Sequence, residues 1–410
     1  MSIPVSTAKL ASWRTPAIVL IAGCLVGAIG FGPRSALGLF LNPMSSANGW
    51  GRDVFALALA LQMLLWGAAQ PIAGAIADRF GAALVLSAGA VLYAIGLVLM
   101  AYSHAPGLLY LSAGVLIGFG LAGSSFTIVI GSFGKLMPTE WRSLAFGAGT
   151  AAGSFGQFLF SPLAIGLIGE FGWQMALVIF AAITLLIIPF SLPLSTPEAK
   201  PSAGAARQSL KQALAEALGH RSYVLLVIGF FTCGFQLFFI TVHLPAYLVD
   251  RGLSADIGAW TIAVIGLFNI VGSLSAGWLS DKMPKRYLLA LIYFARSLAV
   301  LAFISVPASP VSALAFGAVI GLLWLSTVPP TNGLVVIMFG THWLTTLAGV
   351  AFFSNQVGGF LGVWLGGVLF ERTGSYDVVW WLAIVLGVLS ALVNLPIVEK
   401  PVARMAAAPA

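Results

Sequence analysis

Twelve long stretches of the chain carry almost no charged residues, and this pattern limits the possible folds more than any other feature. They cover residues 16–41, 54–77, 82–103, 107–133, 144–169, 173–193, 222–249, 257–280, 287–306, 310–339, 344–370 and 377–398. Each is long enough to cross the apolar core of a bilayer as an α-helix, which takes about 20 residues. Only 8% of the residues are charged, whereas a soluble domain has about 25%. We therefore predict an all-α membrane protein with twelve transmembrane helices, called spans 1–12 below.

A polar stretch separates the first six spans from the last six. Residues 195–221 contain prolines, a glycine and several basic residues, and no other polar stretch is as long. We expect one six-helix bundle over residues 1–194 and another over 222–410, joined by a linker over 195–221. Within the linker, 209–218 fits either a short amphipathic helix on the membrane surface or a solvated segment.

The two halves repeat each other. Four residues have the same residue type 203 positions later in the chain, namely the pairs Gly49 and Gly252, Asp53 and Asp256, Gly74 and Gly277, and Asp78 and Asp281. Three further pairs lie 202 positions apart, namely Gly156 and Gly358, Phe158 and Phe360, and Gly172 and Gly374. Since the chain has only six aspartates, two aspartate pairs at one offset indicate that a six-span unit was duplicated in parallel.

The basic residues predict the orientation. With the N-terminus inside, fourteen of the 19 lysines and arginines fall in inner loops and tails, and only Arg52, Arg251 and Arg372 fall in outer loops. Cytoplasmic loops carry such an excess. We expect both termini and the linker to be cytoplasmic, in the inner membrane of a bacterium.

A loop motif after span 2 resembles one in a known transport family. Residues 74–81 read Gly-Ala-Ile-Ala-Asp-Arg-Phe-Gly, and a second copy begins at Gly277 after span 8. This resembles the G-x-x-x-D-R-x-G motif of the major facilitator superfamily, which implies two six-helix bundles and a latch at the inner gate. The residues that the resemblance assigns to the latch are Gly74, Asp78, Arg79, Gly277, Asp281, Lys282 and Arg286. The alternative is that these are only charges at helix ends.

Span 1 resembles a narrower family. Residues 31–35 read Phe-Gly-Pro-Arg-Ser, followed by Gly-Trp-Gly-Arg at 49–52, which is similar to the monocarboxylate transporters and their bacterial relatives. The resemblance implies that Arg34 occupies the position of a lysine that handles substrate and proton. The family's span 8 aspartate and arginine correspond to Asn269 and Ser273, so the family's proton relay is absent at those positions.

Two arginines lie inside spans, where a charge costs at least about 2.5–3.5 kcal/mol on insertion scales. Arg34 in span 1 favours a carboxylate ligand, since its fork offers parallel donors. The alternatives are that its side chain snorkels to the outer headgroups or pairs with a structural partner. Arg296 in span 9 fits equally a structural role or substrate contact. All twelve acids fall at span ends or in loops, so we expect a positively charged cavity. A proton, if co-transported, would need a span-end acid, His243 or the substrate carboxylate.

We therefore predict a secondary transporter in which two bundles alternately expose a small organic anion, with proton symport as the candidate coupling. The expected substrate-binding residues are Arg34, Gln157, Gln236, Asn269, Thr331, Asn332 and Asn355. The alternatives are a carrier of neutral or hydrophobic compounds of the drug-efflux type, and a membrane sensor that does not transport. The sequence contains no nucleotide-binding loop, catalytic constellation or metal-ligand spacing. We therefore expect no enzymatic activity, cofactor or bound metal. We also expect a monomer surrounded by lipid, without a nucleic-acid partner.

Overall fold

The computed structural model describes residues 13–195, 210–340 and 344–402, and all regular structure in them is helical. The helices of the first half are α1 (Pro16–Ala36), η1 (Leu37–Phe40), α2 (Leu41–Asn48), α3 (Arg52–Phe80), α4 (Ala82–Ala101), α5 (Pro106–Leu109), the π-helical η2 (Tyr110–Leu116), α6 (Ile117–Gly123), α7 (Phe126–Leu136), α8 (Thr139–Leu185), α9 (Ile187–Ser191) and η3 (Leu192–Leu194). Those of the second half are α10 (Leu210–Gly219), α11 (Arg221–Asp250), α12 (Ala255–Lys282), α13 (Lys285–Ser305), α14 (Pro310–Leu323), α15 (Val328–Phe339), α16 (Leu344–Thr373) and α17 (Asp377–Asn394).

The predicted twelve crossings are confirmed. Among the described residues, eleven helical segments are long and apolar enough to span a bilayer. The longest, Gly147–Leu194, contains two crossings, because the chain turns at Gly172 with φ 78° and ψ 161°. Counted as two, it brings the total to twelve.

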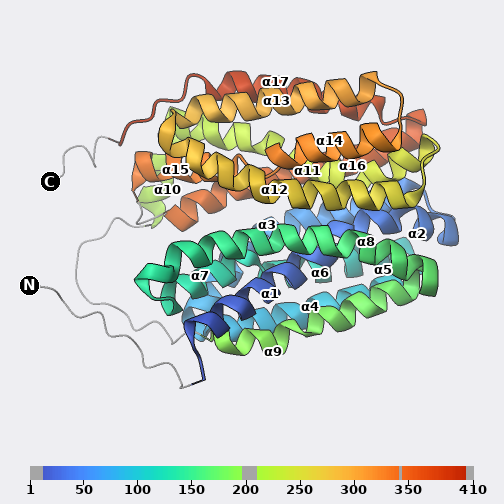
Figure 1. The fold of residues 1–410 in the computed structure, drawn as a ribbon, viewed down its shortest axis with the longest axis horizontal. Helices are drawn as coiled ribbons and strands as arrows, with labels where there is room; N and C mark the ends of the chain where they lie inside the picture. The colour runs from blue at the N-terminus through green and yellow to red at the C-terminus, as the bar shows by residue number, and fades with distance from the viewer. Residues whose placement is uncertain (1–12, 196–209, 341–343, 403–410) are drawn as a thin grey trace, which may run out of the picture.

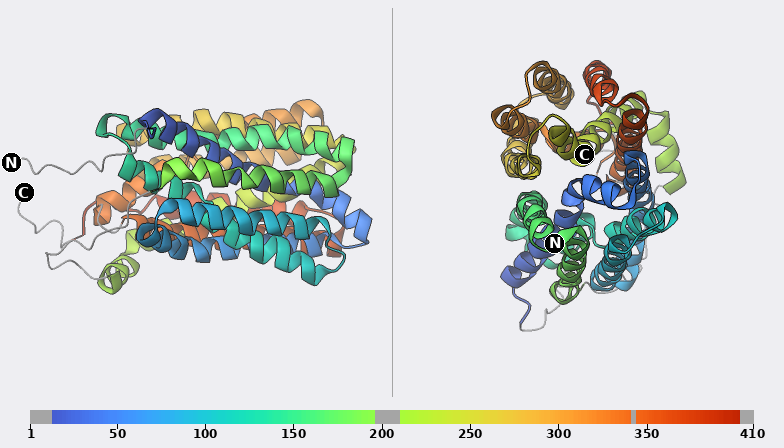
Figure 2. Two further views of the ribbon diagram at one scale, coloured as in Figure 1. Left: turned by 90° about the horizontal axis from the view of Figure 1, so that it is seen from below. Right: turned by 90° about the vertical axis from the view of Figure 1, so that its right-hand side faces the viewer.

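The two halves lie side by side, with their long helices roughly parallel (Figures 1 and 2). The starts of α1 and α11 and the end of α17 lie at one end of the molecule, which we call the terminal end. The α2–α3 turn lies at the opposite, far end. Residues 196–209 of the expected linker lie outside the described residues, and the segment after them forms α10, whose Ala213 and Ala217 are buried.

The sequence repeat is also a repeat of backbone shape. Gly49 and its counterpart Gly252 both adopt positive φ, at 66° and 84°, and so do Gly172 and Gly374, at 78° and 69°. Left-handed backbone favours glycine because glycine has no Cβ. These two glycine pairs therefore mark equivalent turns between spans.

Three spans are interrupted near their middle, and these breaks shape the space between the bundles. Span 1 passes from α1 through the 3₁₀ turn η1 into α2, span 4 breaks at Ser124 and Ser125, and span 10 breaks between Leu323 and Val328. The breaks in spans 4 and 10 lie about one repeat length apart. Backbone that leaves the helix at this depth needs other partners for its polar groups.

Candidate functional site

Arg34 lies next to the break in span 1. It follows Pro33 in the last turn of α1, just before the chain tightens into η1. Its side chain is 4% exposed, so the guanidinium is turned into the protein and not toward lipid. The sequence prediction that Arg34 faces the interior agrees with this placement.

The guanidinium of Arg34 is enclosed by apolar and aromatic groups from both bundles. Its Nη2 lies 2.7 Å from the Sδ atom of Met63. The ring centroids of Phe238, Trp66 and Phe31 lie 4.4, 5.1 and 5.6 Å from its Cζ atom. Phe238 belongs to α11 of the second half, so Arg34 stands at the junction between the bundles.

These contacts leave the charge of Arg34 unbalanced. Among the described residues no carboxylate forms an ion pair with it, and its Nε has no hydrogen-bond partner. Cation–π contacts contribute about 2 kcal/mol when desolvated, whereas burying an ion costs several kcal/mol. A guanidinium also offers five N–H donors. The arrangement therefore leaves a cationic site with free donors.

Two of the predicted substrate residues connect the bundles to each other. The Gln157 Nε2 on α8 donates to the carbonyl oxygen of Ile262 on α12 at 3.2 Å. The Asn269 Nδ2 donates to Ser154 Oγ at 2.8 Å, and its Oδ1 accepts from the Leu325 N–H at 2.9 Å in the span 10 break. In this conformation both amides hold helices together.

Two more predicted residues make contacts within the second half. The Gln236 Nε2 donates to the Ala383 carbonyl at 2.9 Å, and the Asn355 Nδ2 donates to the Phe230 carbonyl at 3.3 Å. The Gln236 Oε1 has no partner among the described residues. Their donors are therefore occupied by neighbouring helices.

The last two predicted residues differ in exposure. Thr331 is buried and its hydroxyl has no partner among the described residues, whereas Asn332 is exposed. Sequence reasoning did not select Gln356, which is fully buried on α16 with both amide atoms unpartnered among the described residues. Its side chain packs against Gly67 of α3, the neighbour of Trp66. An amide inside a span was the available signal.

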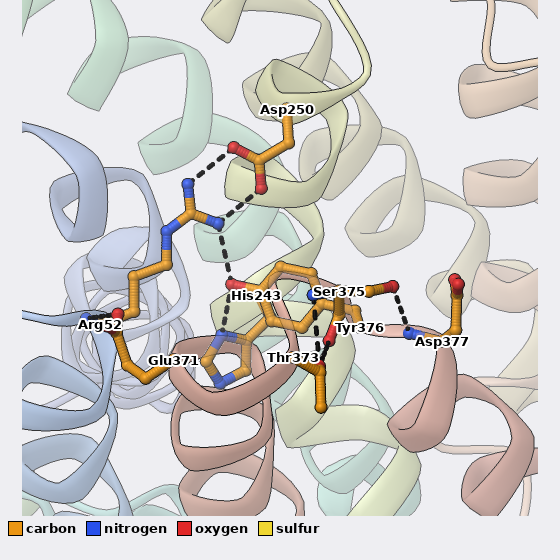
Figure 3. Close-up of polar contacts among 8 residues, drawn as sticks. All are labelled: Arg52, His243, Asp250, Glu371, Thr373, Ser375, Tyr376 and Asp377. Carbon is orange, nitrogen blue, oxygen red and sulfur yellow. Dashed lines mark hydrogen bonds and ion pairs between the residues drawn. The ribbon is translucent and has the colours of Figure 1, made fainter.

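A cluster of charged groups closes the far end of the molecule between the bundles (Figure 3). Arg52, at the start of α3, makes a two-pronged ion pair with Asp250, at the end of α11, with N–O distances of 2.5 and 2.7 Å. The backbone N–H of Arg52 donates to Glu371 Oε1 on α16 at 2.6 Å. Carboxylates are favourable at a helix N-terminus. The first residue of α3 is thereby fixed to two helices of the other half.

Tyr376 extends this cluster into the protein. Its phenol oxygen accepts from Arg52 Nη1 at 3.1 Å and lies 3.2 Å from His243 Nδ1. The turn at Gly374 positions the tyrosine just before α17. Burial raises the pKa of the Tyr376 phenol to about 12, although the nearby Arg52 charge partly opposes this. The phenol therefore keeps its proton at neutral pH. We call Arg52, His243, Asp250, Glu371 and Tyr376 the far-end cluster.

The contact between α3 and α16 is confined to part of their length. Near the far end, a Cβ on Gly367 would collide with Ala56, and near the middle a Cβ on Gly67 would lie 2.8 Å from Gln356. A Cβ on Gly74, close to the terminal end, would meet nothing within 4 Å among the described residues. The bundles are thus closed at the far end and open toward the terminal end at this helix pair.

Comparison with a family model decides which proteins share this architecture. Residues 23–363 match the model described as Major Facilitator Superfamily. The chain belongs to the Major Facilitator Superfamily. It is accordingly a secondary transporter and not an enzyme, and superfamily members bind small-molecule substrates.

Curated relatives within the superfamily are distant in sequence but match most of the chain. The uncharacterized MFS-type transporter YcxA of Bacillus subtilis (strain 168) is 28% identical over 387 residues, covering 90% of this chain and 92% of the relative. Monocarboxylate transporter 11 of Mus musculus is 28% identical over 378 residues, covering 88% and 82%. These matches confirm a distant relation to the monocarboxylate transporters.

A solved structure supports the superfamily fold. A bacterial homolog of the human lysosomal transporter Spinster, in an inward-facing and unoccupied conformation, superposes with a TM-score of 0.73. The two sequences are 15% identical, and the match covers 94% of this chain and 98% of the homolog. At this identity the likeness shows the fold alone.

The first copy of the superfamily motif lies at the end of α3. Arg79 is exposed, with its guanidinium 5.2 Å from the ring of Phe80. Gly74, which the resemblance assigns to the latch, faces open space among the described residues in this conformation. The side chain of Asp78 lies outside the described part, so its pairing stays a prediction.

The second copy of the motif forms no latch among the described residues. A Cβ on Gly277 would meet no atom within 4 Å among the described residues. Asp281 is exposed and forms no ion pair with Lys282 or Arg286 among the described residues. The backbone N–H of Arg286 instead donates to Glu399 Oε1 at 2.8 Å. The latch assigned to these residues stays a prediction for the conformation closed at the terminal end.

For Arg296 the sequence leaves open a structural role and contact with the substrate. The residue is fully buried, and its guanidinium forms hydrogen bonds with backbone carbonyls. Its Nε and Nη2 donate to the Leu323 carbonyl at 3.0 and 2.6 Å, and Nη2 also donates to the Trp324 carbonyl. These carbonyls end α14, where a cation is favourable. The contacts favour a structural role at the break in span 10.

Proposed function

We propose that this superfamily transporter carries a small organic anion whose carboxylate binds Arg34 between the two bundles. The observation that supports the proposal is the buried guanidinium of Arg34, which has no anionic partner among the described residues. A carboxylate would supply the missing charge and accept two parallel N–H bonds. The rings of Trp66 and Phe238 would cover the apolar part of a short substrate.

The relatives agree with this substrate class. One of them is named monocarboxylate transporter 11, and Arg34 takes the place of a lysine in the motif that resembles that family. The contacts support alternating access, because the far-end cluster joins the bundles in the conformation that opens toward the terminal end. Breaking that cluster and closing the terminal end would expose Arg34 to the other side.

A binding screen with matched acids and amides tests the substrate class. Purified protein would be heated with monocarboxylates of two to six carbons, and with the amide of each acid, which has the same shape without the charge. A ligand at 100 times its Kd stabilises the folded protein by about 2.7 kcal/mol. We expect at least one acid to raise the Tm while its amide does not.

The variant Arg34→Gln should lose this response, and the matched variant Arg372→Gln should keep it, since Arg372 is exposed in the last turn of α16. If an amide raised the Tm as much as its acid, the result would favour transport of neutral or hydrophobic compounds instead.

We also propose that the protein lies in the plasma membrane of a bacterium with its terminal end in the cytoplasm, which the excess of basic residues in the predicted inner loops supports. In a background without Cys24 and Cys233, cysteines would replace Ser46 at the far end and Lys211 on α10, both exposed. A membrane-impermeant maleimide added to intact cells should label position 46 and not position 211. The reverse pattern would invert the topology.

A further inference from the structure

We propose that His243 is a proton-binding site whose protonation opens the far end of the transporter. The proposal rests on the transport function and orientation proposed above, but it does not depend on the substrate class. His243 is fully buried on α11, and it is the innermost member of the far-end cluster (Figure 3).

The hydrogen bonds around His243 assign its proton. Its Nε2 lies 2.8 Å from the Val363 carbonyl oxygen on α16. A carbonyl can only accept, so we assign the proton to Nε2. In the neutral ring, Nδ1 then accepts, and its partner is the Tyr376 hydroxyl at 3.2 Å. The oxygen of that hydroxyl accepts in turn from Arg52 Nη1 at 3.1 Å. Each group in this chain therefore donates to the next, from Arg52 to Tyr376, from Tyr376 to His243 and from His243 to the Val363 carbonyl.

A second proton on His243 would conflict with this chain of hydrogen bonds. A protonated Nδ1 becomes a donor that points at a hydroxyl group, which must then give up its own bond to the ring. Tyr376 cannot become a phenolate acceptor, because its pKa is raised to about 12 by burial. Protonation also places a second positive charge near Arg52 in a buried space. The conformation closed at the far end thus holds the neutral histidine.

Helix α16 packs closely against one side of the His243 ring. A Cβ on Gly366 of α16 would lie 2.5 Å from the imidazole, so helix α16 presses directly on the ring. The charged groups near it are Arg52 of α3 and, bound to Arg52, Asp250 of the same helix α11 and Glu371 of α16. The phenol before α17 completes the set. Relief of the conflict therefore requires α3, α11 and α16 to separate.

The chemistry of these groups sets the pH at which opening occurs. A carboxyl group in water ordinarily titrates near pH 4, whereas an imidazole in water titrates near pH 6.5. A single proton site shifts a two-state equilibrium by at most tenfold for each pH unit. Acidification of the far side from pH 8 to pH 5 should therefore favour the conformation that is open at that end.

Double electron–electron resonance on the full chain, which measures the distance between two spin labels, tests this proposal. Spin labels would be attached at Ser46→Cys and Ser254→Cys, which are exposed at the far ends of the two bundles, with Cys24 and Cys233 replaced by alanine. In lipid nanodiscs without substrate, we expect the fraction with the longer label distance to grow as the pH falls from 8 to 5. Growth should not exceed tenfold per pH unit.

Three variants identify the titrating group. His243→Gln stays neutral at every pH and should remove the response. His104→Gln should keep it, because His104 is an exposed histidine in the loop between α4 and α5. Asp250→Asn should raise the open fraction at every pH but keep its dependence on pH. A pH response that survives in His243→Gln, or a wild-type protein whose distances ignore pH, would overturn the proposal.

Nuclear magnetic resonance of the unsubstituted protein gives a second measurement that does not depend on how the variants fold. The ¹⁵N shifts of His243 at pH 8 should show a proton on Nε2 and none on Nδ1. The opposite tautomer would overturn the directed chain of hydrogen bonds. Either failure would leave the carboxylate proposal intact, because that proposal is tested by the acid and amide pair at Arg34.

Discussion

Uptake of a carboxylate substrate is expected to fall about 100-fold or more when Arg34 is replaced by glutamine. Two hydrogen bonds to a charged group contribute roughly 1.5–3 kcal/mol each, and a loss of about 3 kcal/mol corresponds to slightly more than 100-fold in transport efficiency. The measurement is uptake of the acid identified by the binding screen into proteoliposomes that contain equal amounts of wild-type or variant protein.

The same substitution should not destabilise the folded protein. In the absence of substrate, Arg34 is a buried charge without an anionic partner among the described residues. Replacing an unpaired buried charge with a neutral side chain removes a desolvation cost. We therefore expect the Tm of Arg34→Gln to equal or exceed that of the wild type. A lower Tm would mean that Arg34 has a structural partner, and loss of uptake would then not identify a binding residue.

Arg34→Lys is a matched control for the charge. Lysine keeps the positive charge but lacks the planar fork. It should retain part of the uptake, whereas glutamine should retain almost none. Equal uptake by all three proteins would remove Arg34 from the mechanism.

Opening of the far end is expected to increase about five- to thirtyfold when Asp250 is replaced by asparagine. The substitution removes the charge that holds Arg52 across the bundle interface. The side chains of Arg52 and Asp250 are 14% and 32% exposed, so solvent weakens the pair relative to a fully buried one. We take the loss as about 1–2 kcal/mol, which gives the stated shift in a two-state equilibrium. Spin labels at positions 46 and 254 measure the open fraction.

The structure supplies a control pair at the same end. Arg251 and Asp377 lie 3.8 Å apart, are 50% and 66% exposed, and both belong to the second half. Replacing Asp377 with asparagine should leave the open fraction unchanged. Exchanging the charges of the first pair, with Arg52→Asp and Asp250→Arg together, should restore part of the closure. An unchanged open fraction in Asp250→Asn would show that the ion pair does not hold the far end.

Much of the fold could be predicted because the bilayer constrains the sequence strongly. Spans must be long and apolar, and this made twelve crossings visible from runs such as 82–103 and 287–306. The repeat was visible because turns between spans need left-handed backbone. Gly172 and Gly374 kept their spacing for that reason.

The placement of Arg34 in the protein interior could also be predicted, but its surroundings could not. The cost of a charge inside a span singles out a residue without naming its neighbours. Met63 and Phe238 look like ordinary apolar residues in the sequence. They reach Arg34 only because α3 and α11 meet at the break in span 1.

The far-end cluster was missed for a different reason. In the sequence Arg52 and Asp250 look like separate loop charges, and they are 198 residues apart. Their pairing depends on how two whole bundles dock, which no local pattern encodes. The predicted amides Gln157 and Asn269 show the same limit, since an amide that binds a solute and one that binds a facing helix have the same signature in the sequence.

The most direct test of the central claim is a thermodynamic cycle of two proteins and two ligands. Calorimetric titration would measure the affinity of wild-type protein and Arg34→Gln for one monocarboxylate and for its amide. We predict that removing either charge weakens binding by about 2 kcal/mol or more, and that removing both adds little further loss. Losses that simply add would contradict direct contact between Arg34 and the substrate carboxylate.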